Sequence, residues 1–168
     1  GDVQEPELME VTLALGAEML VMAGKAADLA GATAMLKEHL ASGAAYRKFE
    51  EMAKSQGASI PLKMTAAKFT SVVPAPRDGV IIKVKSEAIG WAVIALGGGR
   101  RKAGESIDHS VGFTGILKLG QKVKKGDPLC TVHHSDADVS AVIKDVVAAF
   151  ELGEKAEPSG PMVVERVD

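Results

Sequence analysis

Hydrophobic residues recur at helical spacing through the first third of the chain, and each run is followed by a glycine. The spacing predicts three helices, at residues 7–23, 27–40 and 44–56. The first helix has an apolar stripe that we assign to its inward face, made of Leu8, Val11, Leu15, Met19 and Met22. The other two helices have shorter stripes, made of Leu29, Met35, Leu36 and Leu40 and of Tyr46, Phe49 and Met52.

The first helix is also apolar outside that stripe, at Leu13, Leu20 and Val21. A helix that is apolar nearly all round is normally buried on more than one side. Only two short helices follow it, and each large apolar side chain left in water forfeits about 1.5–3 kcal/mol. We therefore expect an apolar patch on this segment that a partner chain or another part of the same polypeptide covers.

From Phe69 onward the pattern changes to short β-type runs separated by turn residues. These runs predict five strands, at residues 69–73, 80–84, 110–119, 128–133 and 162–167. Two further helices are predicted at residues 87–96 and 138–152, the second with Val139, Ile143, Val146, Val147 and Phe150 inward. The predicted fold class is α+β. It consists of a helical segment (1–57), a linker (58–68) and a domain (69–168) with a strongly curved, mostly antiparallel sheet and two helices.

Composition narrows the class of protein. The 168 residues are 46% hydrophobic and 25% charged, which is typical of a soluble globular protein. A net charge of −2 and an aromatic share of 4% argue against nucleic acid as a partner. The apolar windows are too short to cross a bilayer, and we see no secretory signal. The single cysteine, Cys130, fits a reducing compartment and a buried structural role. We expect a cytoplasmic protein.

The residues that most suggest a binding role lie in the segment 97–106. Three glycines, which permit backbone conformations closed to other residues, precede the cations Arg100, Arg101 and Lys102. These three side chains would bias the local field toward phosphate, and they are our candidate substrate-binding residues. A solvated basic turn explains the same pattern. The glycines match neither of the two common glycine-rich phosphate-binding motifs.

A metal or hydrolytic site is a weaker alternative, built on His133 and His134 with Asp136 and Asp138. Adjacent residues on a strand point to opposite faces, so the two imidazoles are badly placed to share one ion. A strand end followed by an Asp helix cap explains the cluster without a ligand. We therefore assign no metal ligands.

Three blocks of sequence, taken together, resemble the pyrimidine-nucleoside phosphorylases, the family that includes the thymidine phosphorylases. They are TLALGAEML (12–20), ASGAAYRKF (41–49) with Gln56-Gly57, and residues 74–133 with the stretch GGGRRKAGESIDHSVGFTGILKLGQKVKKGDPLCTVH. The first two blocks look like the end of the family's large α/β domain. The third looks like its C-terminal α/β-hammerhead domain.

The resemblance implies an enzyme that transfers the pentose of a pyrimidine nucleoside to phosphate and releases the base. It implies a cytoplasmic homodimer of pyrimidine salvage, with phosphate as co-substrate and no cofactor. The family holds nucleoside and phosphate in its N-terminal part, the phosphate by a Lys-His-Ser and glycine-rich segment. The Lys-Ser pairs here, Lys54-Ser55 and Lys85-Ser86, have neither a histidine nor a glycine-rich loop after them. We therefore assign no catalytic residue, and we expect this chain to be inactive without the N-terminal remainder.

The resemblance also suggests a place for the basic segment. The family's C-terminal domain closes over the active-site cleft by a hinge motion, and we expect Gly98–Ser106 at the cleft mouth. The residues that contact the base are not in this chain, so the choice between thymidine and uridine stays open.

The main alternative is a carrier or binding module without enzymatic activity. Residues 80–84 and 120–129 also resemble strands and turns of biotinyl and lipoyl domains. Those domains present a lysine at a hairpin tip, with methionines beside it in the biotinyl case. Lys63-Met64 echoes that motif, but it precedes the strands instead of lying between them.

Overall fold

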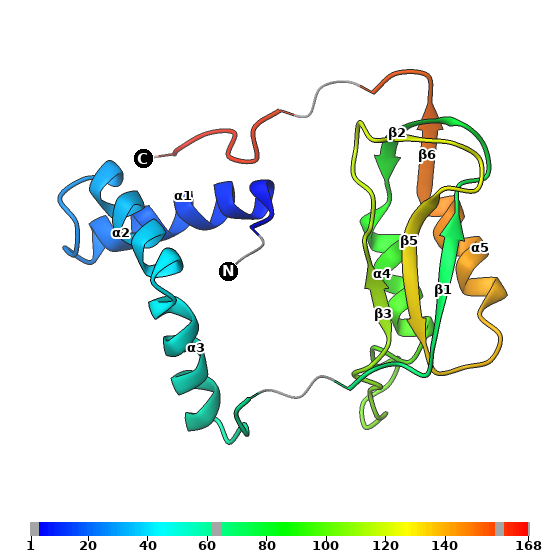
Figure 1. The fold of residues 1–168 in the computed structure, drawn as a ribbon, viewed down its shortest axis with the longest axis horizontal. Helices are drawn as coiled ribbons and strands as arrows, with labels where there is room; N and C mark the ends of the chain where they lie inside the picture. Colours follow the sequence, from blue (N-terminus) through cyan, green and yellow to red (C-terminus); the bar gives the residue numbers. More distant parts are fainter. Residues whose placement is uncertain (1–3, 62–64, 157–159, 168) are drawn as a thin grey trace. The chain divides into compact units, whose positions relative to one another are not determined.

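A computed structural model describes residues 4–61, 65–156 and 160–167 of the chain. The chain forms two compact units (Figure 1). The helical unit comprises residues 1–63 and 160–168, and the mixed unit comprises residues 64–159. The described part of the predicted linker, residues 58–61 and 65–68, contains no helix or strand. The proposed domain division itself stays a prediction.

Three helices make up most of the helical unit: α1 (Pro6–Met22), α2 (Leu29–Ala41) and α3 (Ala44–Ser55). Carboxylates begin two of them, because Glu5 accepts a hydrogen bond from Leu8 N and Asp28 accepts one from Gly31 N, each at 2.7 Å. All three helices were predicted, and their ends differ from the prediction by no more than two residues.

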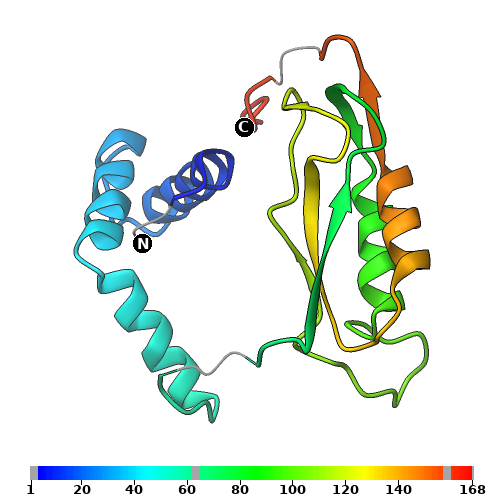
Figure 2. The ribbon, with the colours of Figure 1, turned by 45° about the vertical axis from the view of Figure 1, so that its right-hand side comes forward.

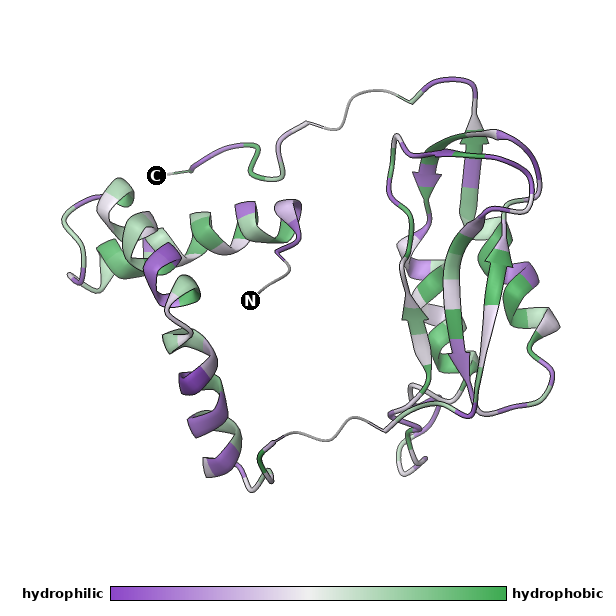
Figure 3. Ribbon diagram, viewed as in Figure 1, coloured by the Kyte–Doolittle hydropathy of each residue, from purple (hydrophilic) through white to green (hydrophobic). Residues whose placement is uncertain are grey.

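The assignment of the inward face of α1 is wrong. Helix α1 packs on α2 through small residues: Ala17 and Ala32 are buried, and Leu36 lies directly against Gly16. Small side chains let two helices approach closely, and for this reason the face with Gly16 and Ala17 is the one that packs on α2. The predicted inward stripe is mostly exposed, at Leu8, Leu15, Met19 and Met22, whereas Leu13, Leu20 and Val21 are half-buried. Figure 3 shows the apolar colour recurring along α1, in contrast to the polar α3.

The predicted strand at residues 162–167 does not form. Glu10 Oε1 accepts hydrogen bonds from Met162 N at 3.0 Å and Val163 N at 3.3 Å. Arg166 forms an ion pair with Glu18 at 3.1 Å. Two backbone donors of this segment therefore bond to a side chain of α1 and not to a neighbouring strand, and the segment belongs to the helical unit.

The mixed unit contains two three-stranded antiparallel sheets within its described residues. The first has the order β1 (Phe69–Pro74), β5 (Pro128–His134) and β3 (Gly112–Thr114). The second has the order β4 (Lys122–Val123), β2 (Gly79–Val84) and β6 (Phe150–Gly153). The predicted α+β class with antiparallel strands is confirmed, although the strands divide between two small sheets.

Helices α4 (Ser86–Ala95) and α5 (Ser140–Ala149) pack against each other and lie on one side of the sheet β1-β5-β3 (Figure 2). Val73 and Cys130 face each other across β1 and β5, and both belong to the core with Val132 and Val146. The side chain of Val72 alternates to the opposite face, where it is half exposed.

Two predicted elements of this unit are shorter than expected. The helix predicted to Leu152 ends at Ala149, because Phe150 and Leu152 instead pair with β2 in β6 and bury their side chains. The strand predicted at 110–119 is reduced to β3. The assignment of inward residues in α5 is confirmed, since Val139, Val146 and Phe150 are buried and the others pack against the core.

No helix in the described ranges has both the length and the apolarity to span a bilayer.

Candidate functional site: the loop between α4 and β3

The three glycines after α4 end the helix and turn the chain back over it. Gly97 N donates to Ile94 O at 3.0 Å, and Gly98 N donates to Val93 O at 2.9 Å, which is the Schellman pattern. Gly97 has a φ of 90°, a conformation that favours glycine. A Cβ on Gly98 would lie 2.7 Å from Val93 Cγ1, and one on Gly99 would lie 2.7 Å from Ile94 Cγ1. The glycines are therefore required by helix termination and close packing.

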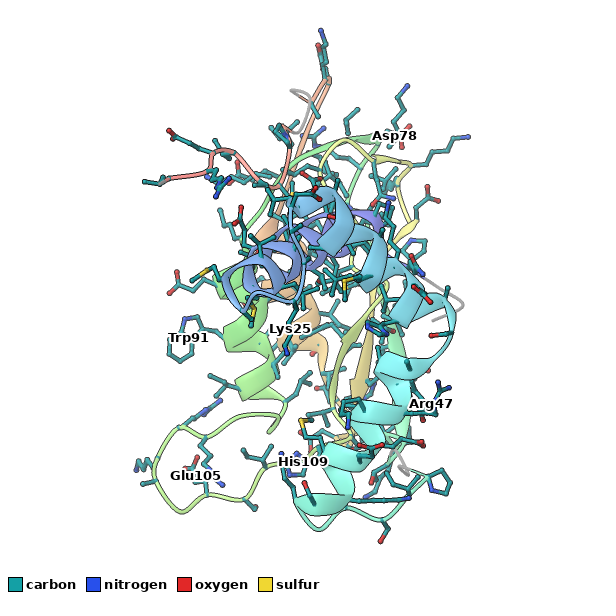
Figure 4. All side chains as sticks on the ribbon, turned by 90° about the vertical axis from the view of Figure 1, so that its left-hand side faces the viewer. Lys25, Arg47, Asp78, Trp91, Glu105 and His109 are labelled. Atoms are coloured by element: carbon teal, nitrogen blue, oxygen red, sulfur yellow. The ribbon has the colours of Figure 1, made fainter. Side chains whose placement is uncertain are left out.

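The tip of the loop is a closed turn held by Glu105. Its carboxylate accepts hydrogen bonds from Arg101 N at 2.8 Å and Lys102 N at 3.2 Å. Its carbonyl oxygen accepts one from Arg100 Nε at 3.1 Å. The side chains of Arg100, Arg101 and Lys102 are all exposed. The turn thus carries three exposed cationic side chains, and the Glu105 carboxylate holds its backbone. Glu105 lies at the end of the mixed unit opposite Asp78 (Figure 4).

The base of the loop is held by Asp108. Its Oδ1 accepts hydrogen bonds from Ser110 N at 2.9 Å and Ser110 Oγ at 2.6 Å, and its Oδ2 accepts one from Ser135 Oγ at 2.6 Å. Its own N–H donates to Gly97 O at 2.9 Å. The hydroxyl hydrogen bonds from Ser110 and Ser135 lower the pKa of Asp108 to about 2. Asp108 therefore bonds to the end of α4 through its backbone N–H, and its ionised carboxylate joins the approach to β3 to the turn after β5.

The prediction singled out the three cations but missed Glu105 and Asp108. A usable signal was present for Asp108, because an Asp two residues before a Ser is a common Asx-turn pattern. Glu105 accepts from backbone donors three and four residues earlier, and no motif identifies that contact in advance.

The two histidines of the metal hypothesis bond to different strands. His134 is buried; its Nδ1 donates to the Asp136 carbonyl at 2.7 Å, and its Nε2 forms a hydrogen bond with the Ser71 hydroxyl at 2.9 Å. His133 Nε2 bonds to the Thr114 hydroxyl at 2.8 Å. Within the described ranges, no group of three or more His, Cys, Asp or Glu side chains is placed to hold a metal ion.

Cys130 is buried in the core, and its burial raises the pKa of the thiol to about 11. The thiol is therefore protonated at neutral pH and is a poor nucleophile. This agrees with the structural role expected from its apolar surroundings in the sequence.

Comparison with known proteins identifies the family. Residues 80–153, which include the whole loop, match the family described as the pyrimidine nucleoside phosphorylase C-terminal domain. A thymidine phosphorylase of Burkholderia cenocepacia (strain HI2424) is 38% identical over all of this chain. Those of Burkholderia lata and Sinorhizobium fredii are 40% and 35% identical over 94% and 99% of it. The chain belongs to the pyrimidine nucleoside phosphorylase family.

The chain spans about 40% of the length of these curated relatives. The phosphorylase match also bears on the carrier hypothesis. Residues 80–84 and 120–129, which suggested a carrier, both lie inside the stretch that matches the phosphorylase domain. The Lys63-Met64 pair lies outside the residues described.

Proposed function

We propose that this chain is the C-terminal part of a pyrimidine-nucleoside phosphorylase. Such an enzyme is a pentosyltransferase that converts a pyrimidine nucleoside and phosphate to the free base and a pentose 1-phosphate. The observation that carries the proposal is the alignment of the whole chain with thymidine phosphorylases about two and a half times its length.

We propose that substrate binding and catalysis belong to the remainder of the enzyme and that this chain has a supporting role. Stabilising the charge on phosphate and on the departing base requires preorganised donors and cations. The sequence motif that supplies them in the family, Lys-His-Ser with a glycine-rich segment, does not occur in this chain. We therefore place phosphate and nucleoside binding mainly in the remainder, and we propose no catalytic residue here.

The role proposed for the mixed unit is to close over the cleft. Its loop carries Arg100, Arg101 and Lys102 at an exposed tip whose backbone is fixed by Glu105. Three cations on a fixed turn raise the local potential for an anion such as phosphate. Closure would add this potential to the phosphate site and exclude water from it.

The role proposed for the helical unit is to dock on the remainder. Leu8, Leu15, Met19 and Met22 are between 62% and 84% exposed, on one face of α1. Covering them would recover about 1.5–3 kcal/mol for each fully buried side chain. We propose the N-terminal remainder as the occupant of this face and a cytoplasmic homodimer as the complete enzyme, with phosphate as co-substrate and no cofactor.

A chimera tests the proposal. This chain replaces the matching segment of the Burkholderia cenocepacia thymidine phosphorylase, and release of thymine from thymidine and phosphate is followed. The same relative without that segment is the control. We expect the chimera to turn over at a rate well above that of the truncated control. A folded, soluble chimera that is no more active than the control would contradict the proposal.

A further inference from the structure

In the loop that carries the basic tip, one residue bonds to both ends of the loop and to the turn after β5. Asp108 bonds through its backbone to the end of α4 at Gly97, and through its carboxylate to Ser110 and to Ser135. We propose that Asp108 is a positioning residue, which holds the basic tip Arg100–Lys102 in the orientation that receives phosphate. This inference rests on the function proposed above.

Asp108 acts by ordering the tip before phosphate binds. Residues 100–106 are exposed and contain no helix or strand, so little packing restricts where the tip points. The tip keeps its internal shape through Glu105, but that contact does not connect it to the rest of the unit. Asp108 supplies the connection by hydrogen bonds to a charged acceptor, which are stronger than neutral ones. If the tip is already ordered before phosphate binds, binding does not have to offset the entropy lost on ordering it.

Asp127 provides a matched control in the same unit. Its carboxylate also caps a turn, accepting a hydrogen bond from Lys124 N at 2.8 Å. Asp127 immediately precedes β5 and Ser135 immediately follows it, so the two carboxylate contacts lie at opposite ends of that strand. Loss of the Asp127 cap should therefore cost local stability without moving the basic tip.

The first experiment reads the order of the loop directly, in the 168-residue chain. Trypsin cleaves after Arg100, Arg101 and Lys102 faster when the loop is less ordered, and mass spectrometry identifies fragments that begin at residues 101, 102 and 103. We expect Asp108→Ala to speed this cleavage about tenfold or more, the usual scale for losing hydrogen bonds to a charged group. Ser135→Ala, which removes only the tether to the turn after β5, should give a smaller increase. Asp127→Ala should give none.

The second experiment tests whether the position of the tip affects phosphate binding, by measuring KM values in the active chimera. Asp108→Ala should raise the KM for phosphate about tenfold, by the same reasoning, with a much smaller change in the KM for thymidine. Asp108→Asn keeps one acceptor oxygen and should fall between Asp108→Ala and the unsubstituted chimera. Loss of folded protein alone would lower the amount of active enzyme and leave both KM values unchanged.

The outcomes separate the two proposals. Unchanged cleavage at the loop in both Asp108→Ala and Ser135→Ala would overturn the positioning role, whatever the chimera does. Faster cleavage with an unchanged KM for phosphate in an active chimera would overturn the connection to phosphate. A folded but inactive unsubstituted chimera would contradict the proposed function, while the trypsin result would still decide whether Asp108 orders the loop.

Discussion

Asp108 and Cys130 are two titratable residues of one unit whose surroundings shift their pKa values in opposite directions. Hydrogen bonds from Ser110 and Ser135 favour the ionised carboxylate, and the pKa of Asp108 falls to about 2. Burial disfavours the thiolate, and the pKa of Cys130 rises to about 11. At neutral pH the Asp108 carboxylate is therefore ionised and stabilises the folded loop, whereas the Cys130 thiol is protonated.

The Asp108 shift predicts a specific pH dependence of stability. A carboxyl whose pKa is 3.8 when unfolded and about 2 when folded stabilises the fold above pH 4, and the contribution is lost as pH falls toward 2. The loss of unfolding free energy in Asp108→Ala should therefore be constant between about pH 5 and 8 and shrink at about pH 3. Urea unfolding at several pH values measures it. A difference that grows on acidification would contradict the assigned contacts.

The Cys130 environment predicts slow chemical modification. At pH 8 the native thiol is protonated and shielded, so a thiol-reactive reagent such as a disulfide dye should label it far more slowly than it labels the urea-unfolded chain. Denaturation should restore the rate of an ordinary cysteine. Equal rates in native and unfolded protein would place Cys130 outside the core.

At the scale of elements, helix α4 and its termination allow a matched pair of substitutions. Gly90 lies inside α4 with no atom near its missing Cβ, so Gly90→Ala should raise stability by about 0.5–1 kcal/mol. A Cβ on Gly98 would meet Val93 Cγ1 at 2.7 Å and the Val93 carbonyl oxygen at 3.1 Å. Neither atom can move freely, so Gly98→Ala should lower stability by about 1–3 kcal/mol. Thermal unfolding of the two variants measures both changes in stability. If both substitutions changed the stability in the same direction, the packing described would be contradicted.

Elements with a strong local pattern were predictable from the sequence, and their partners were not. The spacing of apolar residues located all five helices of the described chain, and glycines marked where several of them end. In α1, two faces are apolar, and the contact was decided by small residues at Gly16 and Ala17, which the periodicity does not weigh. At Phe150, pairing with β2 replaced a helix that the pattern favoured, because alternate residues there also fit a strand.

The positive charge of the candidate site was predictable from the sequence, but the residues that hold the loop in place were not. Three consecutive cations are visible in the sequence, whereas the residues that fix them come from separate segments. Ser135 lies 27 positions after Asp108, and only the pairing of β3 with β5 brings the two together. The three glycines have structural reasons that do not involve a ligand: Gly97 has a positive φ, and Gly98 and Gly99 lie close to Val93 and Ile94.

At the scale of the whole molecule, we propose that this chain belongs to a phosphorylase whose chemistry lies outside it. The most direct measurement incubates the isolated 168-residue chain with thymidine or uridine and phosphate and follows base release. The chimera that carries the same chain serves as the positive control. We predict no release above the uncatalysed rate from the chain alone, because it carries no Lys-His-Ser and glycine-rich segment to support the phosphate. Turnover by the chain alone at an ordinary enzymatic rate would contradict the account.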